Sequence, residues 1–157
     1  MTWTDGTIEG CTLTPLKPFS DERGWLAEFF RHDELGTNLH PVMGYVSMTR
    51  PGVARGPHEH VEQTDLFVFF HGTFRLYLWD TRNDSPTKGV RAVYTVGEAE
   101  PAIILVPPGV VHAYKNTGST DGLIVNCPNQ LYAGVGKAQP VDEIRHEDLA
   151  DSPFTLD

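Results

Sequence analysis

The chain has 157 residues, of which 39% are hydrophobic and 10% aromatic, and its formal net charge is −9. This length and composition fit one folded domain with a buried core and exclude a disordered protein. The negative charge argues against a nucleic-acid partner, because such a partner requires a basic surface. No apolar run is long enough to span a bilayer, so no membrane partner is expected either.

The amino terminus and the cysteines give weaker indications. The chain starts Met-Thr-Trp-Thr-Asp, with neither a basic start nor an apolar stretch. It shows no secretion signal, so we expect a cytoplasmic protein. Cys11 and Cys127 are too few for a disulfide framework or a zinc ribbon, so two buried, idle thiols are expected.

Turn residues recur roughly every eight to twelve positions, and short segments rich in aromatic and β-branched residues lie between them. In chain order, these predicted strands are 24–30, 42–48, 65–70, 73–79, 90–96, 102–106 and 123–127. Short strands at this spacing are typical of an all-β sandwich or barrel. The whole chain, 1–157, is expected to form this single domain.

Four segments carry more specific expectations. Residues 24–30 are apolar on both faces, so one face is expected to cover the barrel and the other to need a partner chain. Residues 73–79 alternate in the manner of a half-buried strand. Helical turns are expected only near 33–35 and 142–146. The tail after Asp148 is expected to be a poorly anchored surface strand.

The most informative polar residues fall in two blocks. His58 and His60 are two positions apart, so on a strand both imidazoles point to one face. Asp65 is an odd number of positions from both, so a turn or bulge must intervene if the three side chains converge. His112 follows a Pro-Pro-Gly turn after the buried strand 102–106, which delivers it to the same place. Three imidazoles and a carboxylate suit a divalent metal such as Fe, Mn, Ni or Zn, and no organic cofactor is indicated.

These blocks resemble the paired signatures of the cupin superfamily. Asp65 stands where the usual pattern has Glu, and Pro101 replaces the leading Gly of the second block. The resemblance implies a double-stranded β-helix, the jelly-roll barrel of the cupins, in which a metal is held between two sheets. It implies the metal ligands His58, His60, Asp65 and His112, with Gln63 as a weaker alternative oxygen ligand.

A second resemblance covers roughly residues 13–148 and is to the dTDP-4-dehydrorhamnose 3,5-epimerase family. It rests on the stretches 21–24, 28–30, 52–58, 80–82 and 85–87 and on the Pro-Gly-x-x-His turn. That family is itself a cupin, usually without metal. The resemblance implies an isomerase of the sugar-epimerase type, which removes a proton next to the carbonyl of a nucleotide-linked 4-keto-6-deoxy sugar in carbohydrate biosynthesis.

Residue roles follow from this second resemblance. His58 matches the general base, with His112 beside it, and a neutral imidazole suits proton abstraction. Arg23 and Arg55 match residues that bind the nucleotide diphosphate, for which guanidinium groups are suited. Glu28 is expected to accept a hydrogen bond at the substrate site.

Three positions depart from the epimerase pattern. His60 stands where the family usually has Gln, and Asp65 where it has the Lys that holds the keto oxygen. Asn126 replaces the catalytic Tyr acid, and an amide cannot supply a proton at physiological pH. A divalent ion at the histidine cluster would restore the lost electrophilic assistance. However, His58 cannot be a metal ligand and the base in the same turnover.

Substitutes for the missing acid and for the base-orienting carboxylate remain open. Tyr132, placed with the substrate-binding residues, is one candidate acid, and Tyr45 and Tyr114 are the others. Asp142 and Asp148 are the candidates for the carboxylate that orients the base in the family.

Three functions therefore remain open. The first is an epimerase with His58 as base. The second is a metal-dependent cupin oxygenase or isomerase acting on a small carbonyl or hydroxyl substrate. The third is a non-catalytic sugar-binding cupin. In the epimerase family the region of 24–30 crosses to a neighbouring subunit, which implies a homodimer in which Arg23 or Glu28 of one chain lies near the substrate pocket of the other.

Overall fold

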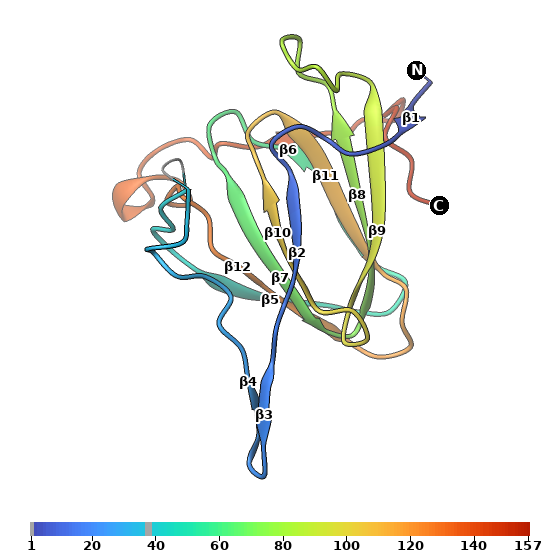
Figure 1. Cartoon of the computed structure of the whole chain (residues 1–157). Coiled ribbons are helices and arrows are strands. Elements are labelled where there is room, and N and C mark those ends of the chain that lie inside the picture. The colour runs from blue at the N-terminus through green and yellow to red at the C-terminus, as the bar shows by residue number, and fades with distance from the viewer. Residues whose placement is uncertain (1, 37–38) are drawn as a thin grey trace.

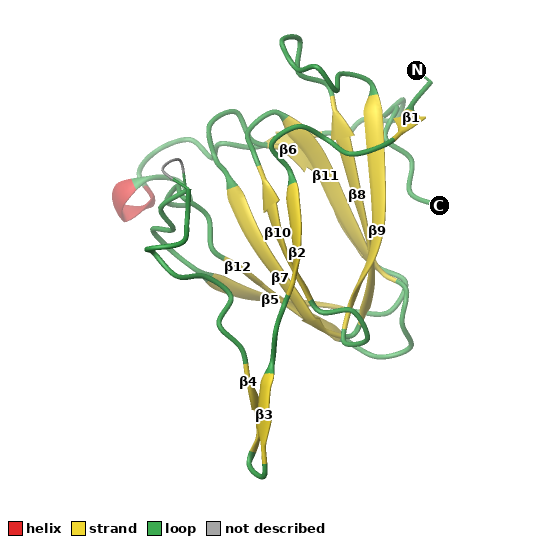
Figure 2. Ribbon diagram, viewed as in Figure 1, coloured by secondary structure: helices red, strands yellow, loops and turns green. Residues whose placement is uncertain are grey.

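The computed structural model describes residues 2–36 and 39–157, and strands dominate this part of the chain (Figure 2). The strands are β1 (Thr4–Asp5), β2 (Thr12–Pro15), β3 (Phe19–Asp21), β4 (Gly24–Leu26), β5 (Tyr45–Thr49), β6 (Ala54–Glu59), β7 (Asp65–His71), β8 (Thr73–Asp80), β9 (Val90–Gly97), β10 (Ala102–Val106), β11 (Val110–Asn116), β12 (Gly122–Asn126) and β13 (Ile144–Arg145). A single 3-10 turn, η1 (Val135–Lys137), is the only helical element among these residues, none of which forms a helix able to cross a membrane.

Two sheets face each other and enclose the core (Figure 1). One has the strand order β1-β9-β8-β11-β6-β13, and the other has the order β2-β10-β7-β12-β5. From β5 to β12 the chain passes repeatedly from one sheet to the other, and the hairpin β8–β9 is the exception. This is the double-stranded β-helix of the cupins, so the expected all-β fold is confirmed.

The core lies between the sheets and is built from alternate positions of their strands. Phe74, Leu76 and Leu78 of β8 point inward and are at most 1% exposed. Phe69 of β7 and Ile104 of β10 meet them from the opposite sheet. Burying each such side chain stabilises the fold by about 1.5–3 kcal/mol. The packed interior keeps the strand ends, and hence the polar residues on them, in fixed positions.

The outer face of β8 is also buried, so the expected half-buried strand is wrong. Tyr77 and Trp79 are 0% exposed because Trp3 and Phe154, from the two ends of the chain, pack over them. The Tyr77 hydroxyl donates a hydrogen bond to the carbonyl oxygen of Asp157 at 2.6 Å. The tail after Asp148 is therefore anchored, contrary to expectation. Its Phe154 covers the apolar outer face of β8, and the alternation of residues 73–79 could not show that this face is covered.

The segment 24–30 differs most from expectation. Only Gly24–Leu26 form a strand, and this β4 pairs with β3 in a hairpin that projects away from the barrel (Figure 1). Trp25 and Leu26 are 58% and 60% exposed, so neither face of the strand covers the barrel. Gly24, the first residue of β4, lies opposite Asp21 beside the hairpin turn and has φ 127°. We call this hairpin, Phe19–Leu26, the arm.

Smaller corrections concern other elements. The strand expected at 42–48 begins only at Tyr45. The segment 33–35 forms a turn without a helix. Residues 144–145 form β13, not a helical turn, because their backbone pairs with the edge strand β6. The other predicted strands match β7 to β10 and β12 within one residue.

Candidate active site

A cavity of about 750 Å³ opens between the two sheets. Its walls come from β5, β6, β7 and β11 and from the chain segment between β12 and the C-terminal tail. The polar side chains that line it are Tyr45, Ser47, Arg55, His58, His60, Gln63, Tyr114, Tyr132, Lys137, Asp142, Glu143, Arg145 and Glu147. Titratable groups of both signs thus converge at one enclosed place.

The pairing of β6 with β11 brings the two histidine blocks together. His58 lies directly opposite His112 in the antiparallel register, and their ring centroids are 4.5 Å apart. This close approach depends on Gly56, which has φ 78° and whose added Cβ would lie 2.5 Å from the His112 carbonyl oxygen. Only glycine fits there, because an L side chain is both strained and sterically blocked.

His58 lies in the cavity wall beside two carboxylates. Its Nδ1 is 3.7 Å from Glu143 Oε1 and 3.8 Å from Glu147 Oε1. Within the described residues this nitrogen is buried and has no hydrogen-bond partner. Burial, reinforced by the His112 and His60 imidazoles, lowers the pKa of His58 to about 2, so the ring is neutral.

His58, His60 and His112 each place one ring nitrogen within 4.8 Å of the others, and Asp65 lies against two of these rings, so the residues of the two blocks converge as the spacing predicted. Asp65 Oδ2 lies 3.3 Å from His60 Nε2 and 3.4 Å from His112 Nε2. Burial opposes ionisation of Asp65, but the two imidazoles outweigh it and lower the pKa of the carboxyl. Burial likewise opposes protonation of His60, but Asp65 raises its pKa on balance. The pKa of His112 is lowered, with burial as the main cause.

The turn required between His60 and Asp65 is present and is fixed by Asp142. The Asp142 carboxylate accepts hydrogen bonds from the backbone N–H groups of Val61, Glu62 and Gln63, each at 2.9 Å. Its backbone carbonyl accepts a hydrogen bond from His60 Nδ1. Asp142 therefore shapes the turn, and the carboxylates that face His58 are Glu143 and Glu147, not the expected Asp142 or Asp148. Periodicity gave no signal for these two, since they lie outside regular structure.

Asn126 is buried behind the cavity wall. Its side-chain amide donates to Asp65 Oδ1 at 2.8 Å and to the Tyr45 hydroxyl at 3.0 Å, and its carbonyl accepts from the Leu66 N–H at 3.1 Å. Tyr45 lies opposite Asn126 in the β5–β12 register. Burial raises the pKa of Tyr45 to about 12, so its hydroxyl keeps its proton.

The expected substrate-binding residues divide into two groups. Arg55 and Tyr132 line the cavity. Arg23 lies on the arm with its side chain 82% exposed and paired to Asp21, and Glu28 lies near Arg31 at 3.7 Å. Neither Arg23 nor Glu28 reaches the cavity formed by the described part of the same chain.

Comparison with known proteins points in one direction. The family model for dTDP-4-dehydrorhamnose 3,5-epimerase matches residues 5–139. The probable low-salt glycan biosynthesis epimerase Agl13 of Haloferax volcanii is 40% identical over 126 residues, which cover 80% of this chain and 81% of that protein. The spore coat polysaccharide biosynthesis protein SpsL of Bacillus subtilis is 40% identical over 127 residues, covering 80% and 82%. The crystal structure of a dTDP sugar isomerase from Desulfovibrio desulfuricans superposes with a TM-score of 0.82 at 26% identity, covering 94% of this chain and 91% of that one.

Proposed function

The chain belongs to the dTDP-4-dehydrorhamnose 3,5-epimerase family and is an isomerase of the sugar-epimerase type, and from this premise we propose that it epimerises a nucleotide-linked 4-keto-6-deoxy sugar with His58 as the base. Of the three functions that the sequence left open, family membership favours the sugar epimerase, and the choice of His58 as base is our proposal. The observation that carries the base assignment is the neutral His58 imidazole in the cavity wall, backed by Glu143 and Glu147.

The two carboxylates suit the role of base-orienting groups. An Nδ1–H of His58 directed toward them leaves the lone pair on the other ring nitrogen, which is the one available to a substrate. Separations of 3.7 and 3.8 Å are longer than hydrogen bonds. Such contacts commonly tighten only when substrate is bound. The negative charge then stabilises the imidazolium that forms when His58 takes up a proton.

The proposed reaction moves one proton off the sugar and one back on. His58 removes the proton from a carbon next to the C4 ketone, and the electrons of that C–H bond move onto the keto oxygen to form an enolate. Return of a proton to the opposite face of the same carbon inverts it and restores the ketone. No group other than protons is transferred, so the step needs no oxidant or reductant.

Tyr45 is the proposed donor of the second proton. Its hydroxyl already accepts a hydrogen bond from Asn126, the residue that replaces the family's tyrosine, so its own O–H is available to the cavity. The site thus compensates for the replacement from the neighbouring strand. The alternative hydroxyl of Tyr114 lies 3.5 Å from Ser47 Oγ, deeper between the sheets.

The cations of the cavity wall suit the diphosphate of a nucleotide sugar. Arg55, Lys137 and Arg145 line the cavity. Arg55 is held by hydrogen bonds to Thr49 Oγ1 at 3.2 Å and to the Met48 carbonyl at 2.9 Å. A guanidinium fixed in this way meets phosphate oxygens with little loss of side-chain entropy.

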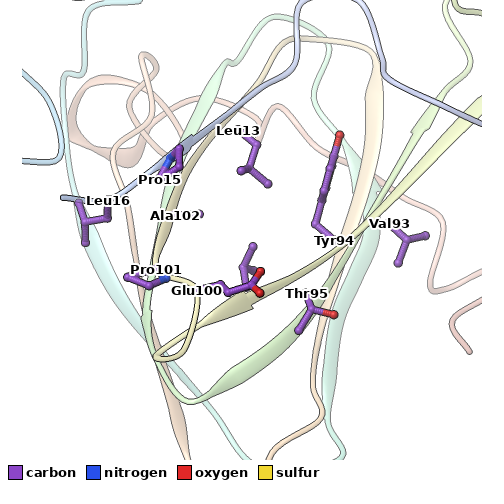
Figure 3. Close-up of a pocket in the computed structure, with 10 residues that line it drawn as sticks. Leu13, Pro15, Leu16, Val93, Tyr94, Thr95, Glu100, Pro101 and Ala102 are labelled. Atoms are coloured by element: carbon purple, nitrogen blue, oxygen red, sulfur yellow. The ribbon is translucent and has the colours of Figure 1, made fainter.

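We further propose a homodimer that completes the nucleotide end of the site. The arm exposes Phe19 by 64% as well as Trp25 and Leu26, and all residues of the edge strand β2 are exposed. Beside β2 lies a groove of about 500 Å³, with Leu13 on one side and Tyr94 of β9 on the other (Figure 3). An apolar edge of this kind favours pairing with a second copy, and Arg23 on the arm would then reach the partner's cavity.

Solvent exchange tests the proposed roles. In deuterated water, the wild type should invert a dTDP-linked 4-keto-6-deoxy sugar and incorporate deuterium, and His58→Asn should do neither. Tyr45→Phe should still exchange the proton, because His58 can return deuterium to the same face, but should yield no inverted sugar. Tyr132→Phe, at the alternative candidate acid that also lines the cavity, should still yield inverted sugar, because Tyr45 is the proposed donor.

Two results would count against these assignments. Exchange that persists in His58→Asn would show that another residue is the base. Inversion at the normal rate in Tyr45→Phe would show that another group donates the second proton.

A further inference from the structure

We propose that His146 and Glu59 are positioning residues for His58: their hydrogen bond on the outer face of β6 holds Glu143 and Glu147 beside His58 on the inner face. Neither His146 nor Glu59 lines the cavity formed by the described part of the chain. The catalytic consequence rests on the proposed function of His58, whereas the position itself is measured without substrate.

The segment 143–147 runs along the edge of β6 and contacts both faces of that strand. Arg145 lies opposite His58, and Ile144 lies opposite Glu59, in the antiparallel register of β13 with β6. Because side chains alternate along a strand, the odd-numbered positions of the segment face inward and the even-numbered positions face outward. The cavity agrees with this pattern, since all three odd-numbered residues line it and neither even-numbered residue does.

On the outer face, the His146 side chain is held from two directions. Its Nε2 lies 2.8 Å from Glu59 Oε1, and because a carboxylate accepts, the imidazole donates this hydrogen bond. The ring also packs against Phe154, with centroids 4.7 Å apart, and Phe154 in turn packs against Trp79 of β8. Only 15% of the His146 side chain is exposed, whereas Ile144, the other outward residue, is 45% exposed. His146 is therefore the side chain that fixes the outer face of the segment.

On the inner face, the contacts are longer. Glu143 Oε1 and Glu147 Oε1 lie 3.7 and 3.8 Å from His58 Nδ1, so the backbone that carries the two glutamates sets their distance from the ring. That backbone is bound to β6 beside His58, because the N–H groups of His146 and Glu147 both donate to the Pro57 carbonyl, at 2.9 and 3.0 Å. Holding His146 therefore fixes the glutamates that precede and follow it in the chain.

The position of the glutamates decides which ring nitrogen of His58 carries the hydrogen. Burial lowers the pKa of His58, so the ring is neutral and has one N–H. Carboxylates beside Nδ1 favour the hydrogen there and leave the lone pair on Nε2 for a substrate. If the segment moves away, Nδ1–H loses these acceptors, and a ring with its hydrogen on Nε2 has no lone pair at Nε2 to accept a proton.

Nitrogen-15 NMR of protein labelled in its histidines reports the tautomer of His58 without substrate, and His58→Asn identifies its signals. The wild type should carry the hydrogen on Nδ1. His146→Ala and Glu59→Ala should each shift the population toward the Nε2–H form. Ile144→Ala is the matched control at the other outward position and should leave the tautomer unchanged.

Steady-state kinetics with a dTDP-linked 4-keto-6-deoxy sugar gives a second readout. His146→Ala should lower kcat by up to about a hundredfold, because a displacement of about 1 Å at a catalytic group has this effect. KM should hardly change, since Arg55 on β6 keeps its place. His146→Gln should restore most of kcat, because its amide can still donate to Glu59. In the double variant, Glu59→Ala should add little to His146→Ala, since both remove the same hydrogen bond.

Three results would overturn the proposal. They are a wild type with the His58 hydrogen on Nε2, a folded His146→Ala with the wild-type tautomer and kcat, and an Ile144→Ala that is as impaired as His146→Ala. If circular dichroism shows that His146→Ala is unfolded, Glu59→Ala and Glu59→Gln replace it, because only the alanine removes the acceptor. Exchange that persists in His58→Asn would remove the base assignment alone, since the tautomer of His58 is measured without activity.

Discussion

At the scale of single residues, hydrogen-bond partners reveal more than residue identity does. Asn126 replaces the catalytic tyrosine of the family pattern, but its side chain forms hydrogen bonds with Asp65, Tyr45 and the Leu66 N–H. Asp142 looked like a candidate orienting group, but its carboxylate holds the turn after His60. The odd number of positions between His60 and Asp65 was enough to predict that turn. The partners themselves could not be predicted, because they lie 61 and 79 to 81 positions away in the sequence.

Removing the Asn126 side chain should destabilise the fold. Asn126→Ala leaves the buried Leu66 N–H without its acceptor and Asp65 Oδ1 without one of its donors. We expect a loss of about 1–3 kcal/mol in the free energy of unfolding. Urea denaturation measures it, and Asn83→Ala, an exposed asparagine on a loop, is the control. Equal stability of both variants and wild type would contradict a structural role for Asn126.

Asp80 should contribute stability that depends on pH. It is 0% exposed and accepts hydrogen bonds from Arg82 at 2.8 Å and from Thr87 at 2.6 Å. Burial opposes ionisation, but the bonds from Arg82, Ser85 and Thr87 outweigh it and hold the pKa of Asp80 below its usual value of 3.8. Since the folded pKa is depressed, this stability is present above the unfolded pKa of about 3.9 and is lost as the pH falls below it.

The measurement compares Asp80→Asn with wild type by urea denaturation at pH 6 and pH 3. The variant should be less stable by about 1.5–3 kcal/mol at pH 6, because hydrogen bonds to a charged group are lost. The difference should shrink at pH 3. A difference that is the same at both pH values would show that the carboxylate charge is not the cause.

At the scale of elements, one glycine sets the approach of β6 to β11. Gly56→Ala places a Cβ 2.5 Å from the His112 carbonyl oxygen, so the strands must separate where His58 and His112 meet. Gly52→Ala is a matched control, because its φ is 75° and no heavy atom of the described residues lies within 4 Å of its added Cβ.

Both substitutions should cost about 1–2 kcal/mol for the left-handed backbone. Only Gly56→Ala should cost more than that and reduce exchange activity. Thermal unfolding and solvent exchange report these effects. If Gly52→Ala reduced function as strongly as Gly56→Ala, close strand approach would not be the cause.

Elements with strong internal patterns could be predicted, and those defined by distant partners could not. Strand 102–106 was predicted without error because it is a short apolar run bounded by prolines. β13 has two residues and no pattern of its own, and it exists because β6 offers an unpaired edge. β4 was predicted as part of the longer strand 24–30, since apolar residues normally mark burial and here Trp25 and Leu26 are exposed.

At the scale of the whole molecule, the exposed arm and groove lead to a test of assembly. Sedimentation at micromolar concentration should give twice the chain mass of 17.4 kDa. Trp25→Ser, which removes an aromatic side chain that is 58% exposed, should shift the protein toward the monomer without loss of fold. Wild type that sediments as one chain would rule out the dimer.

If two chains share each active site, two different inactive variants should restore activity when they are mixed. Mixing inactive His58→Ala with inactive Arg23→Ala should restore some activity, because a hybrid dimer has one cavity with an intact base and an intact arm. Hybrids that form but stay inactive would mean that each site is built from one chain.

The attachment of the C-terminal segment has a consequence for how activity is lost. Glu143 and Glu147 lie beside a strand of two residues, held at the edge of β6, whereas the barrel strands are locked by a common core. Segments with so little buried surface open locally long before the whole fold does. Amide hydrogens of 143–147 should therefore exchange with solvent sooner than those of β8, and mild urea should inactivate the enzyme while its sheets stay intact. Inactivation would then be a reversible local opening, and a substrate that closes the segment would protect the protein's activity without raising the temperature at which the barrel melts.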